Sequence, residues 1–257
     1  MPEQRRIMFL RGSIKTSAQS HMERGIMRRA RRPDERLRSA VPYITKNARI
    51  ADIGTDHAYL PIYLIREGIA SQALVCDINR GPLESALSNI REAGLSDRME
   101  VLQTDGLHGV APFAPDQILI FGMGGELIVR ILSEAPWIRS SSVGLILQPM
   151  TRAETVRAWL WDNGFSVTGE TLTQDGGRIY QTIAARFCGQ TEAYTEEERL
   201  LGKENIRHGG DVFRAFLRHE IAVYETICNG KSNAADTEAP EERQMLAKLK
   251  KRLEESK

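Results

Sequence analysis

The chain has little of what a secreted, membrane-spanning or metal-stabilised protein needs. Its 257 residues include three cysteines, Cys76, Cys188 and Cys228, which are far apart and form no Cys-x-x-Cys motif. An odd, scattered set argues against a disulfide framework or a zinc site and favours a reducing compartment. No apolar run approaches the roughly 18 residues of a membrane span, and residues 1–33 contain no apolar segment typical of a secretory signal. We therefore expect a cytoplasmic protein with no metal and no membrane contact.

The net charge of +1 hides an uneven distribution. Residues 1–33 carry nine Lys or Arg against two Asp or Glu, a net charge of +7, whereas residues 34–188 have −4 and residues 189–257 have −2. A basic arm on a mildly acidic body can bind a polyanion. Because residues 1–33 show little apolar periodicity, we predict that they form a disordered arm. Met22 and Met27 leave a later translation start open.

Between residues 34 and 188, short β-rich runs alternate with helical patterns. The predicted strands are Ala48–Ile53, Ala73–Asp77, Met99–Gln103, Gln117–Phe121, Gly144–Gln148, Phe165–Leu172 and Arg178–Ala184. The predicted helices are Ala58–Glu67, Pro82–Ala93, Glu126–Glu134 and Arg152–Asn163. This alternation is typical of an α/β fold with a doubly wound, mostly parallel sheet. The last two strands predict an antiparallel hairpin, and the whole layout resembles Rossmann-type S-adenosylmethionine-dependent methyltransferases.

Residues 189–257 have a different character. Residues 196–229 carry apolar side chains at near-helical intervals, residues 231–240 are polar, and residues 241–257 form a charged segment with one apolar side. We predict an α-helical hairpin here. Two interpretations stay open: the hairpin packs on the core or on another subunit, or it grips a large substrate.

The most informative segment is Ala51–Pro61 (ADIGTDHAYLP), where a predicted strand turns directly into a predicted helix. A strand that ends in Asp-x-Gly before a helix is typical of a nucleotide-binding turn. The Gly-x-Gly-x-x-Gly spacing of dinucleotide sites is absent, which disfavours an NAD-dependent oxidoreductase. We expect Asp52 to accept a hydrogen bond from a ligand ammonium and Gly54 to let backbone amides approach the ligand. We expect His57 to bind ligand, and Tyr59 either to stack on a base or to pack beneath the sheet.

Further carboxylates follow the next two predicted strands. Asp77-Ile78 ends the second strand, and Asp105-Gly106 follows the third. Because parallel strands present their carboxyl ends at one edge of a sheet, we expect these carboxylates to lie near Asp52. Asp77 is expected to accept hydrogen bonds from ribose hydroxyls, or else to be a solvated strand-end carboxylate, and Asp105 to hold an adenine amino group. Together they predict an adenosine-sized pocket.

The segment Gly122-Met123-Gly124-Gly125 comes directly after the fourth predicted strand. Many amino-group methyltransferases have Asp/Asn-Pro-Pro-aromatic at this place, and this chain has no such side chain. Bare backbone here lets a flat base come close and exposes carbonyl acceptors; the alternative is a tight turn that needs positive φ. We place Gly122 and Met123 on the cofactor side, and Gly124 and Gly125 on the substrate side.

The motifs occur in a fixed order over about Arg36 to Phe187. They are Asp52–Pro61, Asp77-Ile78 with Gly81–Leu83, Asp105–Leu107, Gly122–Gly125, Leu147–Met150, Arg157–Leu160 and Gly177–Tyr180. This ordered set resembles the bacterial tRNA (adenine-22-N1)-methyltransferase family. The resemblance implies a Rossmann methyltransferase domain at 34–188, a helical coiled-coil domain at 189–257, S-adenosylmethionine as cofactor, and N1 of an adenine in tRNA as the methylated atom.

The implied reaction mainly requires that adenine N1, the methyl group and the sulfur lie in line, because N1 carries a free lone pair and can attack directly. Methylation leaves the base cationic, so a carboxylate or carbonyl near N6 would stabilise the developing charge. Our candidates are Asp56 and the carbonyls of Gly122–Gly125, while His57 is expected to position cofactor or base. We expect Arg36 to contact the substrate, as part of a basic group with Arg38, Lys46 and Arg49. The alternative is that these four side chains are solvated and bind nothing.

Two other functions remain open. One is a Rossmann methyltransferase that acts on another RNA, a protein or a small molecule. The other is a non-catalytic RNA-binding protein that keeps a degenerate pocket. The presence of Asp52, Gly54, Asp77 and Asp105 disfavours this second function. The expected partner is tRNA, and we expect a monomer.

Overall fold

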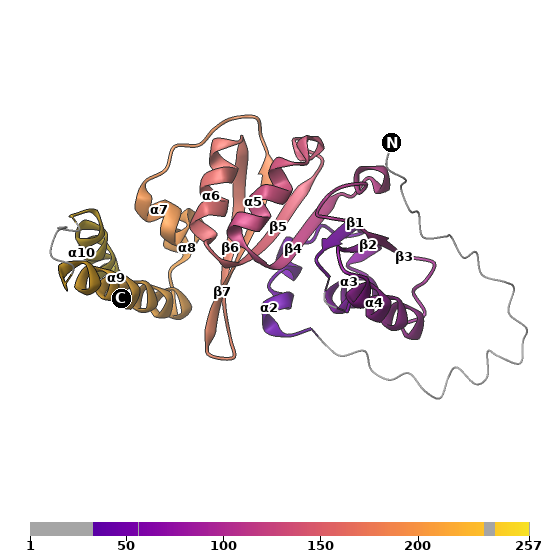
Figure 1. Cartoon of the computed structure of the whole chain (residues 1–257), viewed down its shortest axis with the longest axis horizontal. Helices are drawn as coiled ribbons and strands as arrows, with labels where there is room; N and C mark the ends of the chain where they lie inside the picture. The colour runs from indigo at the N-terminus through magenta and orange to yellow at the C-terminus, as the bar shows by residue number, and fades with distance from the viewer. Residues whose placement is uncertain (1–32, 56, 234–239, 257) are drawn as a thin grey trace, which may run out of the picture.

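The structure is a computed structural model that describes residues 33–55, 57–233 and 240–256. Nearly all of the predicted basic arm, and the predicted catalytic residue Asp56, lie outside the described residues. The described part is built on a seven-stranded sheet in the order β3-β2-β1-β4-β5-β7-β6 (Figure 1). The strands are β1 (Ala48–Ile53), β2 (Ala70–Asp77), β3 (Met99–Gln103), β4 (Gln117–Gly124), β5 (Gly144–Thr151), β6 (Phe165–Asp175) and β7 (Arg178–Phe187).

The first five strands run parallel, and β7 is antiparallel to both β5 and β6. The predicted mixed sheet with its antiparallel hairpin is therefore confirmed. The main differences lie at strand ends. β2 begins at Ala70 instead of Ala73, and β4 continues to Gly124 through an irregular pairing with β5. The Gly122–Gly125 segment is thus largely the end of a strand and not a separate loop.

Helices cover both faces of the sheet. On one face α3 (Tyr59–Arg66) and α4 (Arg80–Glu92) pack on apolar side chains of β1 and β2, and on the other α5 (Gly125–Ser133) and α6 (Ala153–Asp162) pack on β4 and β5. All four predicted helices are present, within two residues at each end. A short helix that the sequence did not indicate, α2 (Glu35–Arg38), precedes the sheet and lies against β6 and β7. Because helices cover both faces of the sheet, the strands have nearly continuous apolar runs in the sequence.

Beyond β7, the described residues form four helices: α7 (Glu196–Leu201), α8 (Lys203–His208), α9 (Asp211–Asn233) and α10 (Pro240–Glu255). The prediction of one helix over 196–229 was wrong. The chain leaves the helical conformation at Gly202, with φ +85°, and again at Gly209 and Gly210, with φ +62° and +93°. Glycine adopts positive φ at little steric cost, so these positions end one helix and begin the next. The predicted hairpin is present as α9 and α10, which pack together around Phe213, Leu217 and Leu249 among others.

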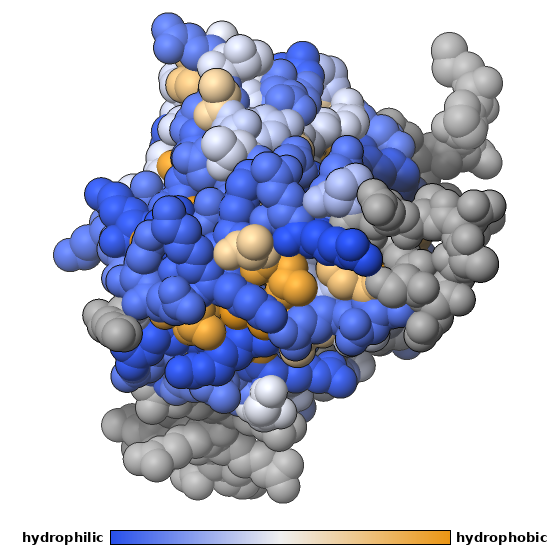
Figure 2. Space-filling model, turned by 90° about the vertical axis from the view of Figure 1, so that its left-hand side faces the viewer, coloured by the Kyte–Doolittle hydropathy of each residue, from blue (hydrophilic) through white to orange (hydrophobic). Residues whose placement is uncertain are grey.

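The surface at the α9–α10 end of the molecule is mostly hydrophilic, with a small hydrophobic area near its middle (Figure 2). On α9, Val223 and Ile227 are exposed. Among the helices described here, none is long and apolar enough to cross a membrane.

A buried ion pair ties the C-terminal helices to the sheet. Arg157 of α6 donates from Nε to Glu170 of β6 at 2.6 Å, and neither side chain has exposed surface. The same guanidinium donates to Gln181 of β7 and to the carbonyls of Arg199 and Leu200 at the end of α7. Glu170 in turn accepts from the backbone N–H of residue 204 at the start of α8. A charged group can be buried this deeply because nearly every donor and acceptor is matched.

We expect Arg157→Met to lower the free energy of unfolding by about 3–5 kcal/mol, because it leaves the Glu170 carboxylate buried without its cation. Urea denaturation measures this. The control is Arg80→Met, which breaks the exposed pair with Glu84 and should cost less than about 1 kcal/mol. If the two variants lost the same free energy of unfolding, the buried pair would contribute no more to stability than an exposed one.

Candidate functional site

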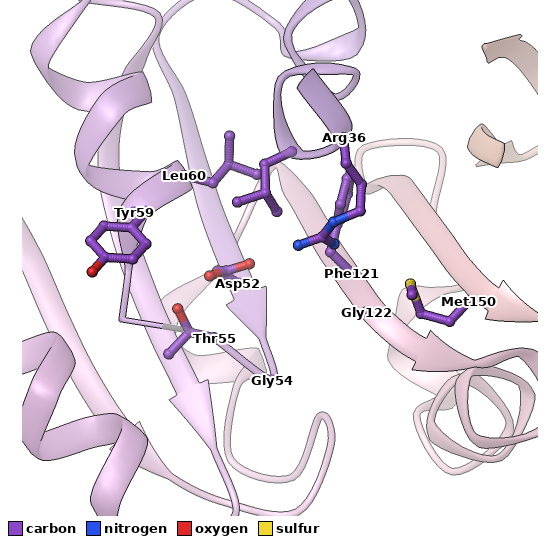
Figure 3. A pocket seen from close by; sticks show the side chains of 10 residues that line it. Arg36, Asp52, Gly54, Thr55, Tyr59, Leu60, Phe121, Gly122 and Met150 are labelled. Carbon is purple, nitrogen blue, oxygen red and sulfur yellow. The ribbon is translucent and has the colours of Figure 1, made fainter. Parts of the chain in front are cut away.

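A cavity of about 320 Å³ opens at the carboxyl edge of the sheet, between the ends of β1 and β4. The strand order turns around at this point: β2 and β3 lie on one side of β1, and β4 and β5 on the other. Ligands of open α/β sheets bind where the order reverses in this way. Figure 3 shows the lining, which among the described residues consists of Arg36, Leu37, Asp52, Gly54, Thr55, Tyr59, Leu60, Phe121, Gly122 and Met150.

Gly54 is needed at the end of β1 for two reasons. Its φ is +75°, and a Cβ atom there would lie 2.1 Å from Cε of Met123. The Met123 side chain of β4 therefore covers the glycine. The N–H groups of Gly54 and Thr55 themselves donate to the Cys76 carbonyl, at 2.9 Å and 3.0 Å, so the predicted approach of backbone amides to a ligand stays a prediction for the other amides of the turn. These two hydrogen bonds fix the turn against β2.

Asp52 is a buried carboxylate in the cavity wall, with 6% of its surface exposed. Burial raises its pKa to about 6, the charge of Asp77 acts in the same direction, and the Thr55 hydroxyl acts against it. Within the described part of the chain, no Lys or Arg forms an ion pair with Asp52. A carboxylate held in this state is suited to a cationic group supplied by a ligand.

Arg36 of α2 reaches the same cavity from the opposite wall, and Figure 3 shows both side chains projecting into it. Its Nη1 donates to Oε1 of the buried Gln148 at 2.9 Å, and its guanidinium carbon lies 5.8 Å from the ring centroid of Tyr180. The Arg36 carbonyl accepts from the Ser39 hydroxyl, which also bonds the hydroxyl of Thr182. Arg36 is thus fixed at both its backbone and its side chain.

The other three members of the predicted basic group do not line the cavity with Arg36. Arg38 forms an ion pair with Glu35 at 2.6 Å. Arg49 lies near the start of β1, at the opposite edge of the sheet, where its guanidinium carbon is 4.6 Å from the ring centroid of Phe113. Arg49 therefore lies away from Arg36, and the predicted basic group for the substrate stays a prediction for the other members.

The turn before α3 has an unusual backbone. His57 and Ala58 have φ of +60° and +57°, which costs about 1–2 kcal/mol for each residue that is not glycine. The His57 carbonyl accepts from the Asn89 side chain of α4 at 2.8 Å. Tyr59 lines the cavity, while the His57 ring lies 5.4 Å from the Tyr59 ring and outside the lining.

The predicted residues on β2 and β3 lie outside the cavity lining. Asp77 accepts from the backbone N–H of residue 79, and Ile78 is 57% exposed. Asp105 forms a surface ion pair with Arg130 at 3.0 Å, which lowers its pKa. Gly106 has φ +57° and lies against Ile131. These residues extend the same sheet edge outward from the cavity, beyond the end of β1.

The glycines at the end of β4 are explained by close packing. Gly122 has φ +79° and lines the cavity, whereas a Cβ at Gly125 would lie 2.3 Å from the Arg152 carbonyl oxygen. A Cβ at Gly124 would lie 3.3 Å from the Thr151 hydroxyl. At Gly125 the close approach of the β5–α6 connection is enough to explain the absence of a side chain, and its place on the substrate side stays a prediction. Gly122 has the positive φ of the alternative interpretation, but at an irregularity within β4 and not in a tight turn.

Sequence reasoning missed several lining residues, although most flank its motifs. Thr55 and Leu60 lie inside the first motif, Phe121 precedes Gly122, and Met150 ends the Leu147–Met150 motif. Leu37 gave no signal, because helix α2 was not predicted. As for metals, the described residues contain no group of three or more His, Cys, Asp or Glu that could hold one.

Comparison with known proteins agrees with this architecture. The methyltransferase domain model matches residues 34–183. The tRNA (adenine(22)-N(1))-methyltransferase of Bacillus subtilis (strain 168) is 34% identical over 228 residues, which cover 86% of this chain and 93% of that protein.

Solved structures give the same result. The B. subtilis m1A22 tRNA methyltransferase TrmK is similar with a TM-score of 0.74 and 32% identity, over 87% of this chain and 96% of the other. M. capricolum TrmK, in complex with its cofactor product S-adenosyl-homocysteine, has a TM-score of 0.74 and 25% identity, over 88% and 99% of the two chains. With the strand order and the cavity between β1 and β4, these matches place the chain in the tRNA (adenine(22)-N(1))-methyltransferase family.

Proposed function

We propose that this protein transfers a methyl group from S-adenosylmethionine to N1 of an adenine, position 22, in tRNA. The observation that carries the proposal is the cavity at the β1–β4 switch point, in a chain that matches the B. subtilis enzyme over 93% of that enzyme's length. S-adenosylmethionine supplies the electrophilic methyl group. The residues of this chain bind and orient the two reactants.

The cavity walls fit the amino acid end of the cofactor. Asp52 is a buried carboxylate with no described cation partner, and Arg36 faces the same space with its guanidinium held by Gln148. A ligand that carries both an ammonium and a carboxylate complements this pair. We therefore assign Arg36 to the cofactor, which replaces its expected role in substrate binding, and Asp52 to the ammonium.

The nucleoside end of the cofactor extends along the sheet edge toward β2 and β3. Asp77 ends β2, the strand that pairs with β1, and this position supports a ribose-binding role. Ile78, exposed beside it, offers an apolar surface for the base. Asp105, oriented by Arg130, and Gly106 complete this side, while Gly122 and Met123 close the other.

The base enters at the side lined by Tyr59. Because N1 lies on the Watson–Crick edge, a paired adenine must leave its stack before it can react. Tyr59, His57, Gly124 and Gly125 are our candidates for holding it, and Asp56 for stabilising the cationic product.

The remaining features complete the proposal. We assign methyl transfer to residues 34–188 and contact with the tRNA body to 189–257, where α9 and α10 lie at one end of the molecule beside the β6–β7 hairpin (Figure 1). Residues 1–33 supply further positive charge for the tRNA backbone. The protein in this proposal is a monomer, and tRNA as substrate supports the cytoplasm.

Purified protein is expected to transfer the labelled methyl group to unmodified tRNA, with mass spectrometry placing it on adenine 22 as 1-methyladenosine. A tRNA transcript with guanine at position 22 is the matched control and should gain no label. Label at another nucleotide would indicate a different RNA specificity. Tight binding of S-adenosylhomocysteine with no label in RNA would favour a protein or small-molecule substrate.

Arg36→Met should weaken the binding of S-adenosylhomocysteine about 10- to 150-fold, which corresponds to about 1.5–3 kcal/mol for hydrogen bonds to a charged group. Calorimetry measures this. Arg38→Met, on the same helix but outside the cavity lining, is expected to bind normally. A neutral analogue without the carboxylate, methylthioadenosine, should bind wild type and Arg36→Met alike; a large difference there would argue against the carboxylate contact.

Binding of S-adenosylhomocysteine should weaken as the pH falls through about 6, the pKa of Asp52. Protonation removes the charge that holds the ammonium, so the Kd should rise by about tenfold per pH unit below that value. Asp52→Asn should bind weakly with this dependence removed. An unchanged Kd between pH 7 and pH 5 in the wild type would contradict the assignment.

The same shift predicts a gain in stability for Asp52→Asn without ligand. The pKa of Asp52 is higher in the folded protein than its usual 3.8, so the folded state binds more protons than the unfolded state between these values. The free energy of unfolding therefore falls as the pH rises from the usual pKa of Asp52 to its pKa in the folded protein. Above that range the ionised Asp52 lowers the free energy of unfolding by up to about 3 kcal/mol. Urea denaturation at pH 8 should therefore show the asparagine variant to be the more stable protein.

A further inference from the structure

The His57–Ala58 turn combines strain with an anchor from another helix. Both residues have positive φ, a region that side chains other than glycine rarely adopt. Ala58 is fully buried, and α3 begins directly after it with no side-chain cap at its first turn. From α4, Nδ2 of Asn89 donates to the His57 carbonyl at 2.8 Å. This contact joins two helices exactly where the chain turns unfavourably, and it involves a residue that no motif had indicated.

We infer that Asn89 is a positioning residue for methyl transfer, which holds the His57–Ala58 turn and so sets where Tyr59 and His57 lie beside the cavity. Tyr59 is the next residue along the chain and lines the cavity, and its ring lies 5.4 Å from that of His57. A small rotation of the turn would therefore move both rings together. The inference rests on the proposed function for its effect on rate.

The cofactor side of the site does not depend on this anchor. The N–H groups of Gly54 and Thr55 are bonded to the Cys76 carbonyl of β2, and Asp52 lies within β1 itself. Loss of the Asn89 contact should consequently disturb the placement of the base more than the binding of cofactor. This separates a positioning role from a general loss of fold.

Asn89→Asp is the sharpest variant, because it keeps the size of the side chain and replaces the donor by an acceptor that repels the His57 carbonyl. In single-turnover methylation of tRNA at saturating S-adenosylmethionine, we expect the rate to fall about 10- to 100-fold, while the Kd of S-adenosylhomocysteine stays within about threefold. Ser88→Ala is the matched control: its neighbouring hydroxyl is exposed and donates only to Glu92, so rate and Kd should both match the wild type.

Rescue by glycine tests the role of strain. Glycine adopts positive φ without the penalty of a Cβ atom, so Ala58→Gly should restore much of the rate lost in Asn89→Ala. A residue that only supported the packing of α4 would not be rescued in this way, because Ala58→Gly adds no contact to that helix.

Hydrogen exchange without tRNA separates the failure of this inference from that of the proposed function. Asn89→Asp should speed amide exchange at Ile62, whose N–H donates to the Ala58 carbonyl at 3.1 Å, and Ser88→Ala should not. If wild type methylates no tRNA, the proposed function fails, while the exchange result still decides whether Asn89 holds the turn. Unchanged exchange, an equal loss of rate and cofactor binding, or absence of rescue by Ala58→Gly would each overturn the inference.

Discussion

The reversal of strand order between β1 and β4 is the constraint on which the rest of the site depends. The chain leaves β1 toward the face that α3 and α4 cover, and it leaves β4 toward the face that α5 and α6 cover. The connections diverge, so a cavity forms between the two strand ends without any special side chain to open it. A residue at the carboxyl end of β1 or β4 therefore lies beside the cavity. Asp52 is the last residue but one of β1, and Phe121 and Gly122 stand near the end of β4.

Asp52 at this site lowers the stability of the protein when no ligand is bound. A carboxylate in this position is unfavourable for the empty protein, as its raised pKa indicates. The same desolvation makes it an effective partner for a ligand cation, since the interaction is weakly screened there. The opposite charge at Arg36 stands on a separate helix and is held by Gln148 and by the backbone contact through Ser39. Arg36 and Asp52 form no ion pair with each other, and the only carboxylate paired with Arg36 among the described residues is that of the exposed Asp34, at 3.9 Å, so a zwitterionic ligand can meet both charges.

Much of the sheet could be predicted from the sequence, because fully buried parallel strands leave continuous apolar runs with turn residues between them. The carboxylates at strand ends were also readable, since topology alone brings them to one edge. Contacts between distant segments were not. Arg157 lies in an ordinary helical pattern, and only the folded chain brings it to Glu170, where burial replaces the exposure expected of an arginine. Likewise, the glycines that divide residues 196–210 have neighbours of good helical pattern, so periodicity continued through them.

Arg36 shows how the same limit affects function. Its neighbours in the chain, Arg38 and Lys46, suggested a basic group that meets phosphates, whereas its neighbours in space are Gln148, Tyr180 and Gly122. These come from β5, β7 and β4, so Arg36 is placed by three strands that lie more than 80 residues away in the sequence. The β6–β7 hairpin that carries Tyr180 also contacts α9 through Leu172 and Ile179. One hairpin thus touches the cavity wall on one side and the C-terminal helices on the other. This packing, and not the connection from β7 to α7 alone, sets how the C-terminal helices lie relative to the cavity wall.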